Sequence, residues 1–164
     1  MSKRIQLNTN YSKDHQIVVG YKLEDEIISF LSDNFSLKKA VFIVDENVLG
    51  LYQNSYISSL KALFDEVVLC SVPEGEQSKS LSQYTDIVDT ILKSKVERST
   101  PVIVIGGGVT GDLGGFAAAS TLRGMPLIHI PTSLLAMVDS SIGGKTGINH
   151  SVGKNLIGAF YSPV

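Results

Sequence analysis

The sequence contains no tryptophan and a single cysteine among its 164 residues. Because one thiol cannot form an internal disulfide bond, nothing requires an oxidising compartment, and we expect Cys70 to be a buried thiol. No stretch reaches the roughly 18 apolar residues of a membrane-spanning helix, and residues 1–13 lack the apolar segment of a signal peptide. Lys and Arg (14) nearly balance Asp and Glu (16), so no basic surface is indicated. We therefore expect a cytoplasmic protein that binds neither nucleic acid nor membranes.

The hydrophobic residues, 43% of the chain, fall in alternating strand and helix patterns. AVFIV at 40–44 is typical of a parallel strand buried on both faces, and 80–95 keep a helical period. Strands are expected at 4–8, 15–21, 40–44, 66–72, 102–105 and 127–130. Helices are expected at 23–34, 57–64, 80–95, from Gly111 to about Gly124, and at 133–138, with a long loop holding a short helix over 142–158. The order predicts one α/β domain with a mostly parallel sheet and helices on both faces.

A glycine cluster, Gly106–Gly111, follows the strand at 102–105 and precedes a predicted helix. It matches G-x-G-x-x-G, where glycines let backbone N–H groups approach a pyrophosphate at a helix N-terminus. The usual acidic residue about 20 positions later is missing. Asp45, at an earlier strand end, could replace it by accepting hydrogen bonds from ribose hydroxyls, which would favour NAD over NADP. A tight turn for the glycines and a helix N-cap for Asp45 are the alternatives.

A second glycine-rich segment, Gly143–Thr146, invites comparison with a P-loop. That motif needs glycine at position 139, where this chain has Asp139, so a Walker-type ATPase is disfavoured. Lys145 and Lys154 stand beside glycines, an arrangement that suits an anionic group, although each could equally be a solvated surface lysine.

The three histidines, His15, His129 and His150, do not pair with acids or cysteines at a metal-ligand spacing. No metal ligand is therefore assigned in this chain. His129 lies within an apolar strand and is expected to be a hydrogen-bonded core residue. Ser140 and Ser141 lack the context of a nucleophile elbow, which argues against a hydrolase.

Several ordered motifs together resemble the 3-dehydroquinate synthase family of the shikimate pathway, which serves aromatic amino acid biosynthesis. These are PEGEQSK at 73–79, GGGVTGDLGGFAAAS at 106–120, RG at 123–124, IPTSLLAMVDSSIGGKTGIN at 130–149 and GKNLIGAF at 153–160. The resemblance implies that residues 1–164 form the Rossmann-like NAD-binding domain of a two-domain, homodimeric enzyme. The second, helical domain, absent from this chain, would bind zinc or cobalt through one glutamate and two histidines.

The resemblance also assigns roles to individual residues. NAD would be held by polar residues and glycines at the strand ends, with Ser133 standing where the family often has Thr: Asp45, Asn47, Glu74, Gly75, Glu76, Gln77, Ser78, Lys79, Gly107, Gly108, Val109, Thr110, Gly111, Asp112, Thr132, Ser133, Lys145 and Lys154. Asp139, Lys145 and Asn155 would face the substrate, and Arg123 would reach the substrate phosphate in the neighbouring subunit's site.

The implied reaction converts a seven-carbon sugar acid phosphate, 3-deoxy-D-arabino-heptulosonate 7-phosphate, into 3-dehydroquinate with loss of phosphate. NAD oxidises a secondary alcohol and later returns the hydride, so the full-length enzyme is a lyase. We expect these 164 residues alone to be inactive and to bind NAD weakly. Another sugar-phosphate cyclase, a polyol or glycerol dehydrogenase, and a binding module without catalysis are the alternatives, and VDSSIGGKTGIN argues against the dehydrogenase.

Overall fold

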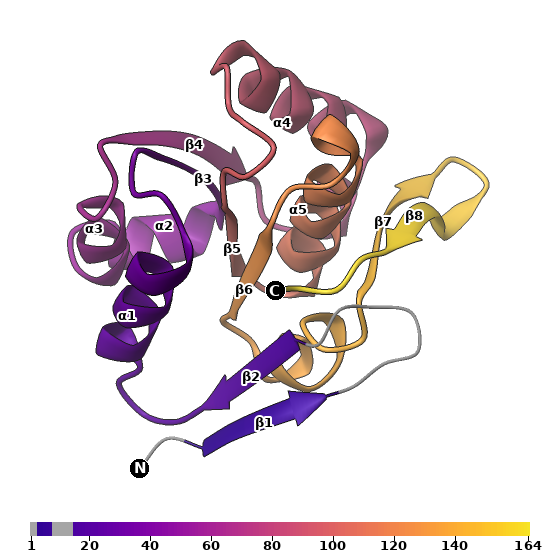
Figure 1. The fold of residues 1–164 in the computed structure, drawn as a ribbon. Helices are drawn as coiled ribbons and strands as arrows, with labels where there is room; N and C mark the ends of the chain where they lie inside the picture. The colour runs from indigo at the N-terminus through magenta and orange to yellow at the C-terminus, as the bar shows by residue number, and fades with distance from the viewer. Residues whose placement is uncertain (1–2, 8–14) are drawn as a thin grey trace.

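A computed structural model describes residues 3–7 and 15–164 of the chain. Its centre is a parallel sheet of four strands in the order β4-β3-β5-β6 (Figure 1). The strands are β3 (Lys39–Asp45), β4 (Glu66–Val72), β5 (Val102–Gly106) and β6 (Leu127–Pro131). All five residues of β5 are buried, as the apolar sequence predicts for a strand covered on both faces.

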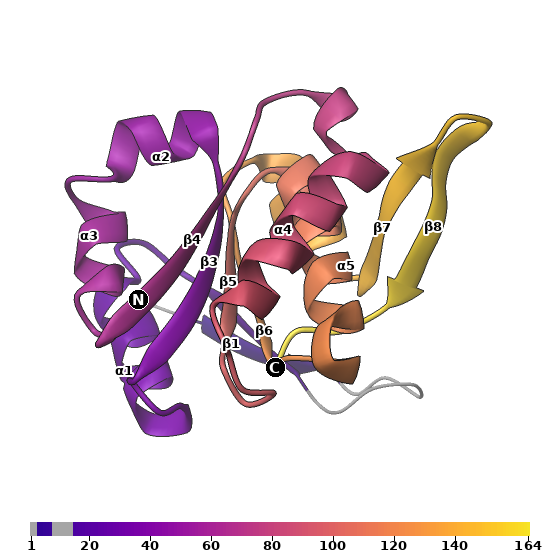
Figure 2. The ribbon, with the colours of Figure 1, turned by 90° about the horizontal axis from the view of Figure 1, so that it is seen from above.

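Helices cover both faces of this sheet, and Figure 2 shows the resulting layers. On one face, α1 (Glu24–Asn34), α2 (Glu46–Tyr52) and α3 (Tyr56–Lys61) pack against alternate strand residues such as Phe42 and Ile103. On the other face, α4 (Leu81–Lys93) and α5 (Gly108–Ser120) pack against Val41 and Val104. The predicted fold class is therefore confirmed.

Helix α5 approaches the sheet closely because its inner surface is built from glycine and alanine. A Cβ atom added at Gly114 would lie 2.8 Å from Cγ2 of Val104. The small buried residues Gly114, Gly115, Ala117 and Ala118 therefore serve close packing, as expected for a glycine-rich helix lying on a strand. This contact fixes the helix and its N-terminus relative to β5.

Two antiparallel hairpins flank the central sheet: β1 (Lys3–Leu7) with β2 (His15–Val19), and β7 (Lys145–His150) with β8 (Gly153–Phe160). The first confirms that strands lie at the two positions expected from the sequence, although β2 ends at Val19 rather than at residue 21, and residue 8 lies outside the described residues. The second hairpin lies beside α5 (Figure 1).

The prediction of a long loop with a short helix over 142–158 is wrong, because these residues form most of the β7–β8 hairpin. Gly147 and Gly158 face each other in register. A Cβ at Gly158 would lie 2.1 Å from the carbonyl oxygen of Thr146. The glycines that indicated a loop instead allow two backbones to approach closely.

A seven-residue helix, α2, directly follows Asp45, and two local predictions need correction. The helix expected over 57–64 ends at Lys61, and Leu63 and Phe64 follow it. The helix expected at 133–138 is largely a π-helix, Ala136–Ser140. Short 3₁₀ turns also occur at η1 (Glu76–Ser78) and η2 (Thr121–Arg123). Within the described part of the chain, no helix has the length and apolar character needed to cross a membrane.

The last residues of the chain run back beside β6 (Figure 1). The Tyr161 hydroxyl donates to the carbonyl oxygen of Met125 at 2.8 Å, and the Val164 N–H donates to that of Leu127 at 3.0 Å. Cys70 on β4 is buried, as predicted, and burial raises its pKa to about 11.

Candidate functional site

The N-terminus of α5 lies where β5 and β6 end, at the carboxyl edge of the sheet. Gly107 precedes the helix, and no side chain among the described residues caps its first amides. The amides of Gly108, Val109 and Thr110 therefore have no partner within the helix. A Cβ at Gly107 would stand 3.5 Å from Oγ of Ser133, and one at Gly108 would stand 3.7 Å from Oγ of Ser140. The space that these missing side chains leave suits a pyrophosphate approaching the amides.

The loop after β6 is held against this glycine turn. The Thr132 N–H donates to the carbonyl oxygen of Gly106 at 2.9 Å, and Oγ of Ser133 accepts from the Ala136 N–H at 3.3 Å. Thr132 thus lies beside Gly106, and Ser133 lies beside Gly107. The buried hydroxyl oxygens of Thr110 and Ser140 have no hydrogen-bond partner among the described residues.

Asp45 and Asn47 lie where β3 ends. Oδ1 of Asp45 accepts hydrogen bonds from the N–H groups of Asn47 (3.0 Å) and Val48 (3.2 Å), so Asp45 is the N-cap of α2. The Asn47 side chain donates to the Glu74 carboxylate. The structure therefore confirms the N-cap, while the Oδ2 atom takes part in neither capping bond.

Residues 74–79 form a compact turn opposite the glycine cluster. Gly75 has φ of +96°, a left-handed conformation that favours glycine, and it leads into η1. Gln77 is exposed and donates to the Glu74 carbonyl oxygen at 3.4 Å, whereas Ser78 and Lys79 are buried. Within this predicted NAD-binding segment, the buried side chains are therefore those of Ser78 and Lys79 at its carboxyl-terminal end.

Lys79 joins three segments of the candidate site. Its side chain is only 5% exposed, and its ammonium group forms an ion pair with Asp112 of α5 and donates to Oδ1 of Asn155 of β8. Burial raises the pKa of Asp112, and the nearby carboxylates of Asp139 and Glu76 act in the same direction, against the opposing effect of Lys79. Lys79 is thus a structural partner of Asp112 and Asn155.

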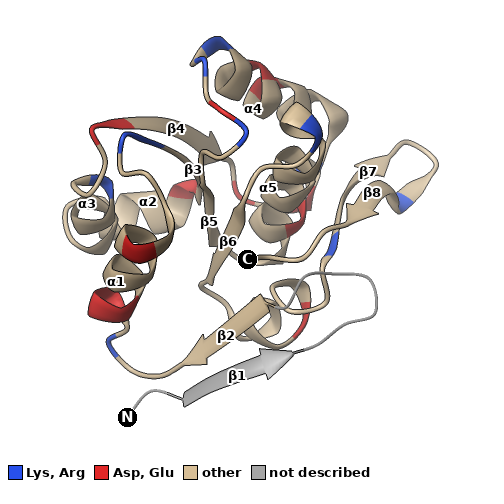
Figure 3. Ribbon diagram, viewed as in Figure 1, with Lys and Arg blue, Asp and Glu red and all other residues tan. Residues whose placement is uncertain are grey.

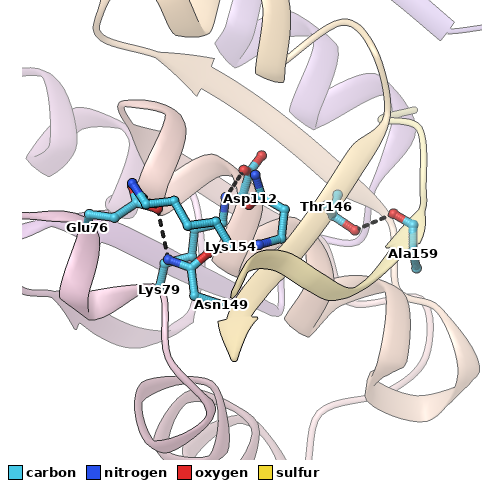
Figure 4. Close-up of polar contacts among 8 residues, drawn as sticks. Glu76, Lys79, Asp112, Thr146, Asn149, Lys154 and Ala159 are labelled. Carbon is cyan, nitrogen blue, oxygen red and sulfur yellow. Dashed lines mark hydrogen bonds and ion pairs between the residues drawn. The ribbon is translucent and has the colours of Figure 1, made fainter. Parts of the chain in front are cut away.

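Glu76 and Asn149 form the second part of this polar cluster (Figure 4). The Asn149 side chain donates to Oε1 of Glu76 at 2.8 Å. This hydrogen bond is the main reason that the pKa of Glu76 is lowered, and the positive charges of Lys154 and Lys79 add to it. Nζ of Lys154 lies 3.7 Å from Oε1 of Glu76, and the Lys154 side chain is exposed.

A cavity of about 510 Å³ opens beside this cluster, between α5, the π-helix and the β7–β8 hairpin. Asp112, Asp139, Lys145 and Asn155 line it with groups of both charges. The structure therefore brings all three residues predicted to face the substrate to one cavity. A smaller hollow of about 370 Å³ is lined by Glu76, Gln77 and Lys79.

Arg123 is the predicted site residue that the structure places elsewhere. It follows the carboxyl-terminal end of α5, in η2, and the 13 residues of this helix separate it from Gly107, a length of roughly 20 Å. Its carbonyl oxygen accepts from Arg98 at 3.4 Å. Basic residues are otherwise scattered over several elements, as Figure 3 shows.

His129 on β6 lies under α5, where Gly111 and Gly115 leave room for its ring. Burial lowers the pKa of His129 to about 4, so the imidazole is neutral at pH 7. The side chain is half-buried rather than fully buried, and its ring forms no hydrogen bond within the described part of the chain, so the expected hydrogen-bonded core histidine is not observed. Those residues also contain no group of three or more His, Cys, Asp or Glu that could hold a metal ion. They do not fit zinc or cobalt, and we assign no step to a metal here.

Two residues of the site were not singled out from the sequence. Asn149 lies in the segment VDSSIGGKTGIN but was not assigned a role, because its position on a strand was not recognised. Thr146 is buried between α5 and the hairpin and donates to the Ala159 carbonyl oxygen at 2.8 Å (Figure 4). Their positions, one and four residues after the predicted site residue Lys145, were the available signal.

The parallel sheet, with the polar cluster and an uncapped helix N-terminus at its carboxyl edge, defines a Rossmann-like α/β domain. The model of the family described as 3-dehydroquinate synthase N-terminal matches residues 69–164. The chain therefore belongs to the 3-dehydroquinate synthase family and corresponds to its N-terminal part.

Individual relatives agree with this assignment. The 3-dehydroquinate synthase of Desulforamulus reducens is 44% identical over 152 residues, which are 93% of this chain and 42% of the relative. The structure of 2-deoxy-scyllo-inosose synthase with carbaglucose-6-phosphate, NAD⁺ and Co²⁺ is 29% identical, with a TM-score of 0.85 over 99% of this chain and 43% of that one. ValA (2-epi-5-epi-valiolone synthase) from Streptomyces hygroscopicus subsp. jinggangensis, with NAD⁺ and Zn²⁺ bound, is 28% identical, with a TM-score of 0.81 over 96% of this chain and 43% of that one. The chain thus spans less than half the length of these proteins.

Proposed function

We propose that this chain is the NAD-binding half of a 3-dehydroquinate synthase. The whole enzyme would convert 3-deoxy-D-arabino-heptulosonate 7-phosphate into 3-dehydroquinate with loss of phosphate, in the cytoplasm. The observation that carries the proposal is the cavity beside the uncapped N-terminus of α5, lined by Asp112, Asp139, Lys145 and Asn155. Family membership and the NAD⁺ named in two structural neighbours support it.

The residues at the strand ends would divide the work of holding NAD. The amides of Gly108 to Thr110 would bind the pyrophosphate, since unpaired N–H groups at a helix N-terminus attract anions. Oδ2 of Asp45 would accept from ribose hydroxyls and repel a 2′-phosphate. NAD, when bound, supplies a hydride acceptor for a secondary alcohol.

The groups around the 510 Å³ cavity would orient the sugar acid phosphate. Lys145, an exposed cation at its wall, suits a carboxylate or phosphate of the substrate. Asn155, held by Lys79 at its Oδ1 atom, can donate its amide hydrogens to a substrate hydroxyl. Arg123, at the far end of α5, would serve the neighbouring subunit of a homodimer.

A second candidate is another sugar-phosphate cyclase. It is favoured by the two structural neighbours, whose names give 2-deoxy-scyllo-inosose and 2-epi-5-epi-valiolone as products. Their identities of 29% and 28% are lower than the 44% of the Desulforamulus reducens synthase, so we prefer the dehydroquinate product.

NAD titration of the 164-residue chain, followed by NMR, tests the cofactor assignment. We expect weak binding, because a dinucleotide in a cleft between domains loses contacts when one wall is missing. Asp45→Asn keeps the N-cap, since asparagine caps as well as aspartate. It should weaken NAD binding by about tenfold and reduce the preference over NADP, because a hydrogen bond to a charged group is lost.

The matched control is Asp86→Asn, an exposed aspartate of α4, which should leave the NAD affinity unchanged. Equal affinities of the Asp45→Asn and wild-type chains would contradict the ribose contact. No chemical-shift change with NAD at millimolar concentration would contradict binding by this chain altogether.

We further propose that the 164 residues do not complete the reaction alone. More than half the length of the named synthase lies outside the matched part, which covers 42% of it. We expect no phosphate release from the sugar acid phosphate when NAD and zinc are added to the purified chain. Release above a protein-free control would refute this.

A further inference from the structure

Asn149, at the end of β7, makes three hydrogen bonds in three directions. Its backbone N–H donates to the Lys79 carbonyl oxygen at 2.8 Å, and its side-chain amide donates to Oε1 of Glu76 at 2.8 Å. Its Oδ1 atom accepts from the Asn155 N–H at 2.9 Å. One residue therefore ties the turn after β4 to the opposite strand of the hairpin.

The chemistry of the partners fixes the orientation of the Asn149 amide. The Glu76 carboxylate is only an acceptor and requires the NH₂ group, while the Asn155 N–H is only a donor and requires the oxygen. A flipped amide would place like groups opposite each other at both ends. An ionised aspartate of the same size has no donor for Glu76 and satisfies only the Asn155 N–H.

The residue that Asn149 holds has an unusual backbone. Asn155 has φ of +57°, in the left-handed region that residues other than glycine adopt rarely and asparagine most readily. Its N–H is fixed by Asn149, and its side-chain oxygen accepts from Lys79. Because Asn155 lines the 510 Å³ cavity, its backbone geometry decides how its amide faces a ligand.

We propose that Asn149 is a positioning residue that fixes Asn155 against Glu76 and Lys79, and so preforms the polar wall of the cavity before a ligand arrives. It touches no ligand itself and acts through Asn155. The inference rests on the proposed function only in taking the ligands of this cavity to be NAD and the sugar acid phosphate. The hydrogen-bond network itself can be tested without either ligand.

Two variants separate the bonds of Asn149. Asn149→Asp keeps the oxygen that accepts from Asn155 but places a carboxylate opposite Glu76. Asn149→Ala removes both side-chain bonds. Asn54→Asp, at an exposed asparagine between α2 and α3, controls for the added charge.

NMR on the full 164-residue chain reads each bond directly. Exchange of the Asn155 amide hydrogen should become at least about tenfold faster in Asn149→Ala, because its acceptor is gone, and should stay near wild type in Asn149→Asp. The pKa of the Glu76 carboxyl should rise in both variants, and more in Asn149→Asp, where a like charge replaces a donor. An unchanged Glu76 pKa in Asn149→Asp, or an unchanged Asn155 exchange rate in a folded Asn149→Ala, overturns the inference.

NAD titration gives the functional readout, and exchanging the amide of Asn149 and the carboxylate of Glu76 between the two positions tests whether binding is restored. Asn149→Asp should weaken NAD binding about tenfold, by loss of one hydrogen bond to a charged group. Combining it with Glu76→Gln restores a donor opposite an acceptor, so the double variant should bind NAD as well as Glu76→Gln alone. A residue that only fills space would show no such rescue, and a double variant that binds NAD more weakly than Glu76→Gln alone overturns the inference.

The two proposals fail in different ways. If the wild-type chain does not bind NAD, the proposed function fails, while amide exchange and the Glu76 titration still decide the role of Asn149. If the wild-type chain binds NAD and Asn149→Asp binds it equally well, the positioning role fails and the proposed function stands.

Discussion

Replacing Gly114 by alanine tests how rigidly α5 is held on the sheet. The new Cβ atom would lie 2.8 Å from Cγ2 and 2.9 Å from Cγ1 of Val104, and 3.4 Å from Cγ2 of Ile43. Both methyl groups of Val104 face the helix, so rotating the valine about χ1 always leaves one of them in contact. Val104 is buried and cannot move outward, and the helix itself must therefore shift.

The expected magnitude comes from two opposing terms. Alanine is favoured over glycine within a helix by about 1 kcal/mol, whereas overfilling a packed core costs about 1–3 kcal/mol. Gly50 in α2 provides the matched control, because nothing lies within 4 Å of a Cβ added there. Gly50→Ala should therefore raise the free energy of unfolding by about 0.5–1 kcal/mol, and Gly114→Ala should be about 1–3 kcal/mol less stable than Gly50→Ala.

Urea denaturation followed by circular dichroism measures both variants, with a shared m-value as the sign that neither changes the unfolded state. A Gly114→Ala chain as stable as Gly50→Ala would refute the reasoning, because it would show that the contact between α5 and β5 yields without cost.

Three further predictions concern single side chains. Burial lowers the pKa of His129 to about 4, below that of the imidazole in the unfolded chain. The free energy of unfolding should therefore be unaffected by this group above about pH 6.5 and should fall by up to about 3 kcal/mol as the pH falls toward 4. His129→Gln should remove that part of the pH dependence in urea denaturation, and identical pH dependences of the two proteins would contradict the prediction. The buried Cys70 thiol, whose pKa is raised to about 11, should react with a thiol reagent at pH 8 at least about 100-fold more slowly in the native chain than in urea; equal rates would show that β4 opens readily. Asp45→Ala should cost about 1 kcal/mol through the lost N-cap while Asp45→Asn costs little, and equal losses in thermal unfolding would exclude capping as the cause.

The strands of the central sheet could be predicted because each is a short apolar run with few alternatives. Val102–Ile105 and Glu66–Val72 are observed within one residue of the expected bounds. The β7–β8 hairpin could not be predicted, because its glycines interrupt the alternation of apolar and polar residues that identifies a strand. Only Thr146 and Ile148 mark its buried side, too few positions for a period to be read.

The candidate site was predictable as a set of residues but not as a network. The family resemblance grouped Asp139, Lys145 and Asn155 as residues that face the substrate, and the structure places all three at one cavity. The pairing of Lys79 with Asp112 was not visible, since the two residues are 33 positions apart and belong to different patterns. The hydrogen bond of Asn149 to Glu76 joins a turn to a strand that had not been recognised.

The bonds that join Glu76 and Lys79 to Asn149 and Asn155 close loops of 73 and 76 residues. Contacts so distant along the chain form only after the loop-closure entropy has been overcome, and a parallel sheet that depends on distant pairings folds slowly. During synthesis, β3, β4 and β5 can therefore associate while the polar cluster still lacks one of its two sides. Because the complete polar cluster exists only in the folded chain, a ligand that binds this cluster would stabilise the folded chain selectively.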